Sequence, residues 1–152
     1  MPGQITVEQI AYDSEEFQQA ASLRYELFFA EHNLPWSVVF DERQRNYCHG
    51  AIVLQNCVVA YGQLLPQSNG IYRICQMVVT PQYQRQNLGS KILLFLIELA
   101  KKQGAIGLVL DARLSAVGFY RKHGFQTCGE QFPSSTTGIL HIVMNRELRI
   151  QQ

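Results

Sequence analysis

The segment QRQNLGS, residues 84–90, lies between two apolar stretches whose patterns differ. The stretch before it, QMVVTPQY at residues 76–83, ends a run that is rich in β-branched and aromatic residues. The stretch after it, KILLFLIELAKK at residues 91–102, is typical of a largely buried helix, whereas the first is typical of a strand. A polar loop with one glycine therefore joins a strand to a helix N-terminus, and it is longer than such a connection usually needs to be.

A loop in this position can bind an anion, because the first amide N–H groups of a helix are free and its dipole is positive there. Gly89 lets the backbone approach a ligand closely, and Asn87 is the non-glycine residue that best tolerates a positive φ. Gln84 and Arg85 add side-chain donors. A purely structural role, in which Gly89 packs against the sheet, explains the loop alone equally well. The spacing matches neither a nucleoside triphosphate loop nor a dinucleotide fingerprint.

The rest of the chain alternates between strand and helix patterns, which predicts a mixed sheet with helices on its faces. Segment 35–46 is ambiguous between a short helix and an ordered loop. Strands are expected at residues 5–12, 51–54, 58–65, 71–80, 106–110, 125–128 and 138–144, and helices at residues 14–30, 88–103 and 115–123.

Length and composition indicate one folded domain, residues 1–152. Hydrophobic residues make up 47% of the chain, charged residues 16%, and the net charge is +1, so nucleic acid is not expected as a ligand. The start lacks a signal-peptide pattern and the longest apolar run, 92–97, is too short for a membrane span, so we expect a cytoplasmic protein without membrane contact. No metal site is predicted from the cysteines, which form no CxxC pair and stand at 48, 57, 75 and 128.

The loop resembles the pyrophosphate loop of the GCN5-related N-acetyltransferase (GNAT) family. That loop has the pattern [QR]xxGx[GA] and follows a strand that ends in V.P. The first glycine of the pattern is Asn87 here, and Arg85 replaces another frequent glycine. The residues that keep the family's order are Val79, Pro81, Tyr83, Gln84, Leu88 and Gly89.

A second motif stands downstream at the distance that the family requires. Ala116 and GFYRKHGF, residues 118–125, resemble the family's A..FY...GF segment, whose tyrosine lies near the sulfur of coenzyme A. The family's frequent asparagine seven residues before that tyrosine is Arg113 here. LRYELFFAEHNLPW at 23–36 and HIVMNREL at 141–148 are similar to segments of the ElaA-like branch.

The resemblance implies a fold and an activity. The fold would be α/β in the α+β sense, one GNAT domain with a mixed, mostly antiparallel sheet of about six or seven strands and helices on both faces. A bulge would lie near the middle of the sheet, where the strands of Val79 and Leu110 splay apart. The activity would be direct transfer of acetyl from acetyl-CoA, the co-substrate, to a primary amine of a small molecule or a protein, without a metal.

By the same resemblance, a group of residues would bind the donor. Backbone groups of one strand would pair with the pantetheine amides, the loop would hold the pyrophosphate, and Tyr120 would also act as the general acid toward the thiolate. The expected set is Met77, Val78, Val79, Gln84, Arg85, Gln86, Asn87, Leu88, Gly89, Ser90, Arg113 and Tyr120.

A base is also expected, because an alkyl amine is mostly protonated at neutral pH. His141, Glu31 and Glu26 are candidates for the base or the acceptor site. His141 can equally be a structural histidine of the sheet, and for the two glutamates the role of solvated helix carboxylates is favoured. Arg24 can face the acceptor pocket or pair with Asp41 or Glu42, and the pairing is favoured. Cys75 is expected to pack, and Tyr25 and Trp36 either wall an acceptor site or fill the core.

Two further functions remain open from the sequence. A non-catalytic acyl-CoA-binding or sensing domain would explain the Arg85 and Asn87 departures, and a protein-interaction module would need no coenzyme A. A homodimer is also allowed. The acceptor amine cannot be deduced from the sequence.

Overall fold

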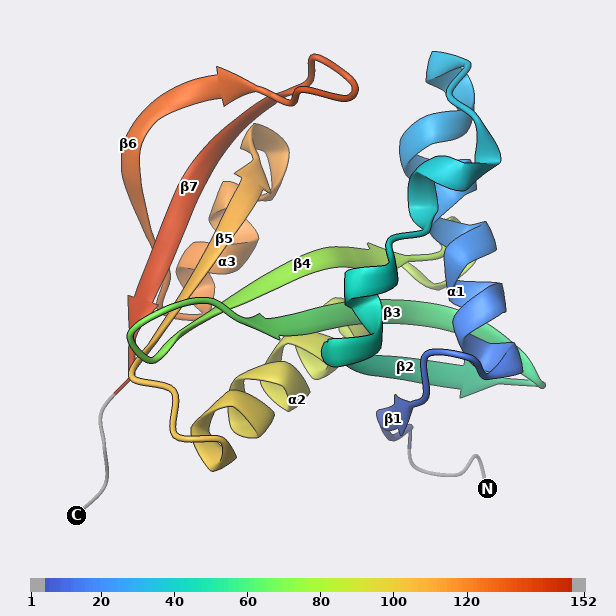
Figure 1. The fold of residues 1–152 in the computed structure, drawn as a ribbon, viewed down its shortest axis with the longest axis horizontal. Coiled ribbons are helices and arrows are strands. Elements are labelled where there is room, and N and C mark those ends of the chain that lie inside the picture. Colours follow the sequence, from blue (N-terminus) through green and yellow to red (C-terminus); the bar gives the residue numbers. More distant parts are fainter. Residues whose placement is uncertain (1–4, 149–152) are drawn as a thin grey trace.

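The structure, a computed structural model, describes residues 5–148 and contains one seven-stranded sheet (Figure 1). The strand order is β1-β2-β3-β4-β5-β7-β6, and all neighbours are antiparallel except β4 and β5. This confirms the predicted fold class. The strands are β1 (Glu8–Ile10), β2 (Cys48–Leu54), β3 (Cys57–Pro66), β4 (Ile71–Val79), β5 (Gly107–Arg113), β6 (Gln126–Pro133) and β7 (Leu140–Glu147).

Three α-helices pack on this sheet: α1 (Glu15–Arg24), α2 (Leu88–Lys102) and α3 (Val117–Lys122). Ser14 begins α1 as its N-cap, where its Oγ accepts a hydrogen bond from Phe17 N at 3.1 Å. The predicted helix at 14–30 changes type after Arg24. It continues as a π-helical turn, η1 (Tyr25–Phe29), and a 3₁₀ turn, η2 (Ala30–His32).

Several predicted boundaries differ from the structure, mostly where pairing rather than local sequence decides them. β1 is shorter than 5–12, whereas β6 and β7 extend beyond 125–128 and 138–144 because each supplies the other's hydrogen bonds. The ambiguous segment 35–46 forms two 3₁₀ turns, η3 (Trp36–Val39) and η4 (Glu42–Asn46). Short 3₁₀ turns of this kind carry little periodicity that a sequence could show. The remaining helix and strand predictions are confirmed within a few residues.

Two apolar cores lie on opposite faces of the sheet. The first is formed by α2, α3 and the strands, and the second by α1 with parts of β2, β3 and β4. Gly62 of β3 faces α2 so closely that a Cβ there would lie 2.8 Å from Ile92 Cγ2 and from Met77 Sδ. The close approach of α2 to the sheet therefore depends on a residue without a side chain.

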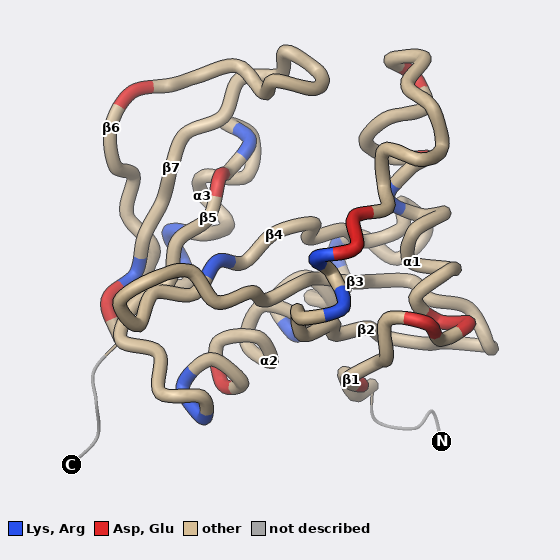
Figure 2. The backbone as a smooth tube through the Cα atoms, viewed as in Figure 1, with Lys and Arg blue, Asp and Glu red and all other residues tan. Residues whose placement is uncertain are grey.

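Charged residues of both signs are interspersed over the molecule rather than gathered on one face (Figure 2). Within residues 5–148, no helix has the length and apolar character required to cross a membrane.

We predict that Gly62→Ala destabilises the protein by about 1–3 kcal/mol, because the added methyl group overpacks the contact between β3 and α2. Gly118→Ala is the matched control, since a Cβ at Gly118 would meet no atom within 4 Å and alanine favours a helix. Urea unfolding of both variants would measure the effect. Equal stability of the two variants would show that α2 shifts to accept the methyl group without cost.

Candidate active site

The site begins where β4 and β5 separate. These two parallel strands pair only at Ile71, Tyr72 and Arg73 of β4, opposite Gly107, Leu108 and Val109 of β5. Arg73 Nη1 lies 3.1 Å from Asp111 Oδ1 just beyond the last pair. The predicted splay between the strands of Val79 and Leu110 is therefore present.

A β-bulge in β4 accompanies the separation. Tyr61 of β3 lies opposite Val78 and Gln63 lies opposite Cys75, so β4 carries one residue more than β3 across this interval. Gln76 has a φ of 58°, in the left-handed region that β-strand residues rarely adopt. Because of the extra residue, Ile74 and Met77, which are three positions apart, both face the first core, whereas regular alternation would place them on opposite faces of the sheet. The predicted bulge near the middle of the sheet is confirmed.

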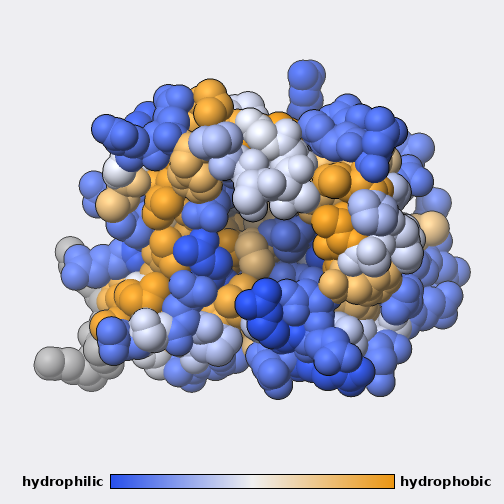
Figure 3. Space-filling view, turned by 45° about the horizontal axis from the view of Figure 1, so that its top comes forward, coloured by the Kyte–Doolittle hydropathy of each residue, from blue (hydrophilic) through white to orange (hydrophobic). Residues whose placement is uncertain are grey.

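A cavity of about 400 Å³ opens at the separation, and the space-filling view shows a hollow near the middle of the face turned to the viewer (Figure 3). Its walls come from five parts of the chain: the bulge of β4, the end of β5, the π-turn η1, the segment 116–120 that begins α3, and the hairpin of β6 and β7 with its connection. Residues that bear on its chemistry are Cys75, Met77, Asp111, Arg113, Tyr120 and His141.

The loop at residues 84–90 leads into the start of α2 with two residues in the left-handed region. Arg85 and Asn87 both have a positive φ, 68° and 65°, and both are exposed. In the first hydrogen bond of the helix, Lys91 N donates to Asn87 O at 3.1 Å. The amide N–H groups of Leu88, Gly89 and Ser90 therefore have no acceptor within the helix. The side chain of Leu88 is buried in the first core, which leaves only its backbone for a ligand.

Side chains of the loop are held by neighbouring elements. Gln84 Nε2 donates to Val79 O at 3.2 Å, and Ser90 Oγ lies 3.1 Å from His123 Nε2. The side chain of Gln86 is exposed. These contacts anchor both ends of the loop and leave its middle open to solvent.

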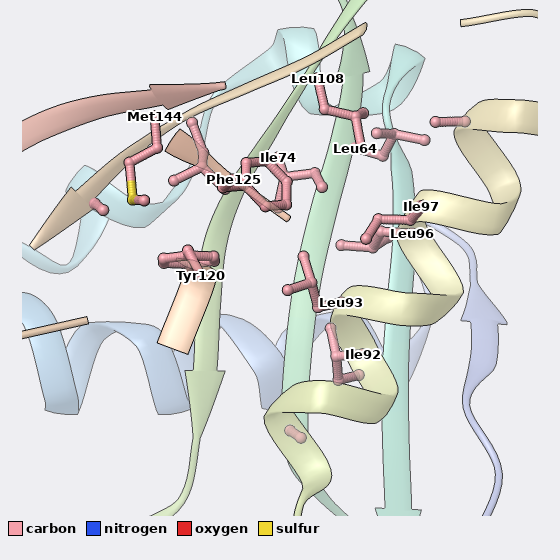
Figure 4. Close-up of a cluster of buried hydrophobic side chains, with 14 of the residues drawn as sticks. Leu64, Ile74, Ile92, Leu93, Leu96, Ile97, Leu108, Tyr120, Phe125 and Met144 are labelled. Carbon is pink, nitrogen blue, oxygen red and sulfur yellow. The ribbon is translucent and has the colours of Figure 1, made fainter. Parts of the chain in front are cut away.

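Tyr120 projects from α3 to the margin of the first core and lines the cavity. Its ring lies at the Phe125 and Met144 side of the buried cluster, away from Leu96 and Ile97 of α2 (Figure 4). The side chain is 8% exposed, and burial raises its pKa to about 12. The phenol is therefore protonated over the whole neutral range and can act only as a proton donor there.

His141 of β7 is the candidate base that the structure brings to the cavity. Its Nδ1 lies 2.8 Å from Ile139 O, and a carbonyl can only accept, so Nδ1 carries the proton. The Nε2 of the neutral ring is then free to accept a proton. The ring stacks on Phe132 at 6.0 Å, which fixes its plane.

The two carboxylate candidates for the base lie away from this cavity. Glu31 lies outside the cavity lining, its side chain is 76% exposed, and its nearest charged partner is His32 at 3.6 Å. Glu26 is also exposed and does not line the cavity. The carboxylate that does line it is Asp111, which strand pairing alone brings there and which no sequence motif marks.

The contacts of four further residues bear on their predicted roles. Within residues 5–148, Arg24 forms no ion pair with Asp41 or Glu42, so the favoured pairing is wrong: Asp41 binds Arg43 at 2.7 Å, and the side chain of Arg24 is buried. Tyr25 and Trp36 line neither this cavity nor a second one that adjoins it beside Arg24. Their rings pack edge to face with centroids 5.3 Å apart. The guanidinium of Arg113 lies 5.0 Å from the ring of Phe28 and lines the cavity.

Comparisons with known proteins agree with this geometry. The uncharacterized N-acetyltransferase YjcF of Bacillus subtilis (strain 168) is 28% identical over 138 residues, covering 91% of this chain and 97% of the relative. The crystal structure of Escherichia coli ElaA has a TM-score of 0.80 at 18% identity, with 95% of this chain and 100% of that chain covered. An aminoglycoside 6'-N-acetyltransferase in complex with coenzyme A has a TM-score of 0.76 at 15% identity, with 96% and 98% covered. At these identities the structural likeness shows the fold.

The sequence itself is matched by the family model described as the acetyltransferase (GNAT) family, over residues 10–125. This match spans most of the chain and includes both the loop at 84–90 and the segment that ends with Phe125. The non-catalytic sensor and the interaction module are therefore set aside. The chain belongs to the acetyltransferase (GNAT) family, and the protein is an acyltransferase.

Proposed function

We propose that this acyltransferase moves an acetyl group from acetyl-CoA to a primary amine of a small molecule or a protein. The observation that carries the proposal is the gap between β4 and β5, which opens beyond Arg73 and leads to the amide-rich loop at the start of α2. The coenzyme A complex of an aminoglycoside acetyltransferase with this fold supports the choice of donor.

The chain's own groups suit the charged and amide parts of acetyl-CoA. The free amides of Leu88, Gly89 and Ser90 and the exposed Arg85 would hold the pyrophosphate. Beyond Arg73, backbone groups on the β5 side of β4 have no strand beside them. Met77, Val78 and Val79 would use them to bind the pantetheine arm, as a sheet edge binds an added strand.

The residues around the cavity would divide the proton transfers between them. The neutral amine attacks the thioester carbonyl, an N–C bond forms and the C–S bond breaks. His141 Nε2, or a water bound to it, would take the proton that the amine loses, and Tyr120 would give a proton to the departing sulfur. The amide near Met77 would donate to the carbonyl oxygen as it gains charge.

Replacing Gly89 with glutamate should weaken acetyl-CoA binding at least tenfold, about 1.4 kcal/mol, because it places a negative charge beside the pyrophosphate. Isothermal titration calorimetry would measure the Kd. Gly89→Ala is the control for bulk, since a Cβ at this position would lie 3.5 Å from the Phe119 ring, an ordinary contact. A folded Gly89→Glu protein with the parent Kd would remove the loop from the binding site.

Tyr120→Phe should lower kcat roughly tenfold to a thousandfold, with a smaller effect on the Kd for acetyl-CoA. The substitution keeps the ring that packs against Phe119 and Phe125 and removes only the hydroxyl. Steady-state thiol release would measure kcat, and a thermal melt of the same sample would detect a packing defect. Transfer at the parent rate by a folded variant would assign proton delivery to water or to another side chain.

The pH profile of kcat/KM gives an independent test of Tyr120. The raised pKa, about 12, means that the donor form persists as pH rises and is lost only near that pH. The neutral fraction of an alkyl amine also increases up to its own pKa near 10.4. The rate should therefore rise to about pH 10 without an alkaline decline. A decline with an apparent pKa of about 8–9 that disappears in Tyr120→Phe would contradict the assignment.

A further inference from the structure

Arg24, the last residue of α1, is the most deeply buried charged residue that the structure describes. Its side chain is 1% exposed, and its Nε and Nη2 atoms are enclosed without a hydrogen-bond partner. The guanidinium lies over two aromatic rings, 5.0 Å from the centroid of Tyr61 and 5.6 Å from that of Phe17. These contacts attract the cation but accept none of its hydrogen bonds.

No negative charge within residues 5–148 compensates this cation. Burial raises the pKa of Tyr61 and raises that of Cys75 to about 12, so both are neutral at pH 7. His49 lies with Nε2 at 2.8 Å from Gln44 O, and burial lowers its pKa, so it is neutral as well. Burial also lowers the pKa of Arg24, but a guanidinium stays protonated in proteins.

An enclosed charge without a counter-ion is costly, and such a group in a folded protein needs an explanation. An ion pair within the protein does not explain the buried charge, because Asp41, the partner expected from the sequence, binds Arg43 instead. That pair uses Nε and Nη2 of Arg43, at 3.1 Å and 2.7 Å from Asp41 Oδ2. The same two nitrogens of Arg24 are the ones left without a partner.

A second cavity, of about 270 Å³, lies beside Arg24. Three arginines line it, Arg24, Arg43 and Arg73, but only one carboxylate, that of Asp41. In Figure 2 the acidic and basic positions of the segment that precedes β2 adjoin one another along the chain. Arg43 is paired with Asp41, and Arg73 is paired with Asp111 of the neighbouring strand, so the uncompensated positive charge at this cavity is that of Arg24, which suits an anionic group.

The second cavity adjoins the first at the bulge of β4. Four residues line both cavities: Phe29, Arg73, Cys75 and Gln76. A molecule that places an anionic end near Arg24 can therefore extend past Gln76 into the space where the thioester is expected. The buried charge of Arg24 is therefore placed to contact the acceptor. The phosphates of the donor would lie elsewhere, at the loop that begins α2.

We propose that the acceptor of this enzyme is a small amine that carries a carboxylate, in the class of amino acids, and that Arg24 binds this carboxylate in the second cavity. The inference rests on the proposed acetyl transfer. The Nε and Nη2 edge of a guanidinium matches the two oxygens of a carboxylate, as the Arg43–Asp41 pair shows. Because both nitrogens are enclosed, binding requires the guanidinium to turn toward the cavity.

The first test uses the parent protein and pairs of amines that differ only in the carboxylate, such as lysine and lysinamide or β-alanine and β-alaninamide. We expect kcat/KM to be at least tenfold higher for the carboxylate of each pair. In each pair, the amino group nearest the carboxyl position is less basic in the amide and so has the larger neutral fraction, which works against this expectation. Equal rates for the two members, or a preference for the amides, would overturn the proposal.

The second test assigns the preference to Arg24. Arg24→Met keeps an unbranched stem and removes the guanidinium with its charge, and Arg43→Met makes the same change at the exposed rim of the same cavity. We expect the carboxylate preference to fall at least tenfold in Arg24→Met and less than threefold in Arg43→Met. A preference that survives in Arg24→Met, or falls equally in both variants, would overturn the role of Arg24.

A binding measurement separates this proposal from the acetyl transfer itself. Thermal melts of the parent protein at constant ionic strength should show a saturable rise in Tm with propionate and none with propionamide. Arg43→Met should keep the rise and Arg24→Met should lose it. The parent comparison decides the matter even if Arg24→Met does not fold. A rise in Tm without transfer to any amine would refute the proposed reaction and keep the carboxylate site, whereas no rise with propionate would refute the site.

Discussion

The lost pairing between β4 and β5 is the constraint on which the rest of this structure depends. Backbone N–H and C=O groups inside a sheet need partners, and beyond Arg73 and Val109 the two strands no longer supply them to each other. The strands can part because α2 and α3 pack on one face and bury Ile74 and Leu110 in a common core. The bulge at Gln76 lets β4 bend while Met77 and Val78 still reach opposite cores. A single irregularity thus creates both a groove with free backbone groups and a cavity beside it.

The irregular segments around the groove determine what it can accept. Three segments without regular secondary structure or with only short turns form the rim: the π-turn Tyr25–Phe29, the 3₁₀ turns before β2, and the β6–β7 connection. They rest on a rigid sheet, which is the usual arrangement for binding sites. Beside them lies the buried charge of Arg24 at the end of α1, whose Nε and Nη2 have no hydrogen-bond partner. The cost of this buried charge is understandable where a ligand supplies the missing partner.

The sequence predicts the donor side of the site better than the acceptor side. The donor side depends on residues that are neighbours in the chain, whereas the acceptor side depends on contacts between residues far apart in the sequence. Asn87 has the positive φ expected of it, and α2 begins directly after it, because both depend on neighbours in the chain. The place of Glu31 could not be predicted, since the switch from α-helix to π-turn after Arg24 rotates all later side chains away from the face that a continuous helix would give. Asp111 was missed because only the pairing of β5 with its neighbours brings it to the cavity.

The two sides of the site also differ in what they require of the sequence. Two solved structures at 15–18% identity share the fold, with TM-scores of 0.76 and 0.80. In this chain the groove needs only backbone groups, a bulge and a helix N-terminus. The acceptor side needs particular charges in particular places, and a few substitutions in short turns can change them without disturbing the sheet. Here Gln44, a neutral side chain that is 5% exposed, lines the second cavity with Arg24. Its Oε1 accepts a hydrogen bond from Asp41 N at 3.2 Å, so Gln44 brings no negative charge to the cavity, and Arg24 stays available to a ligand.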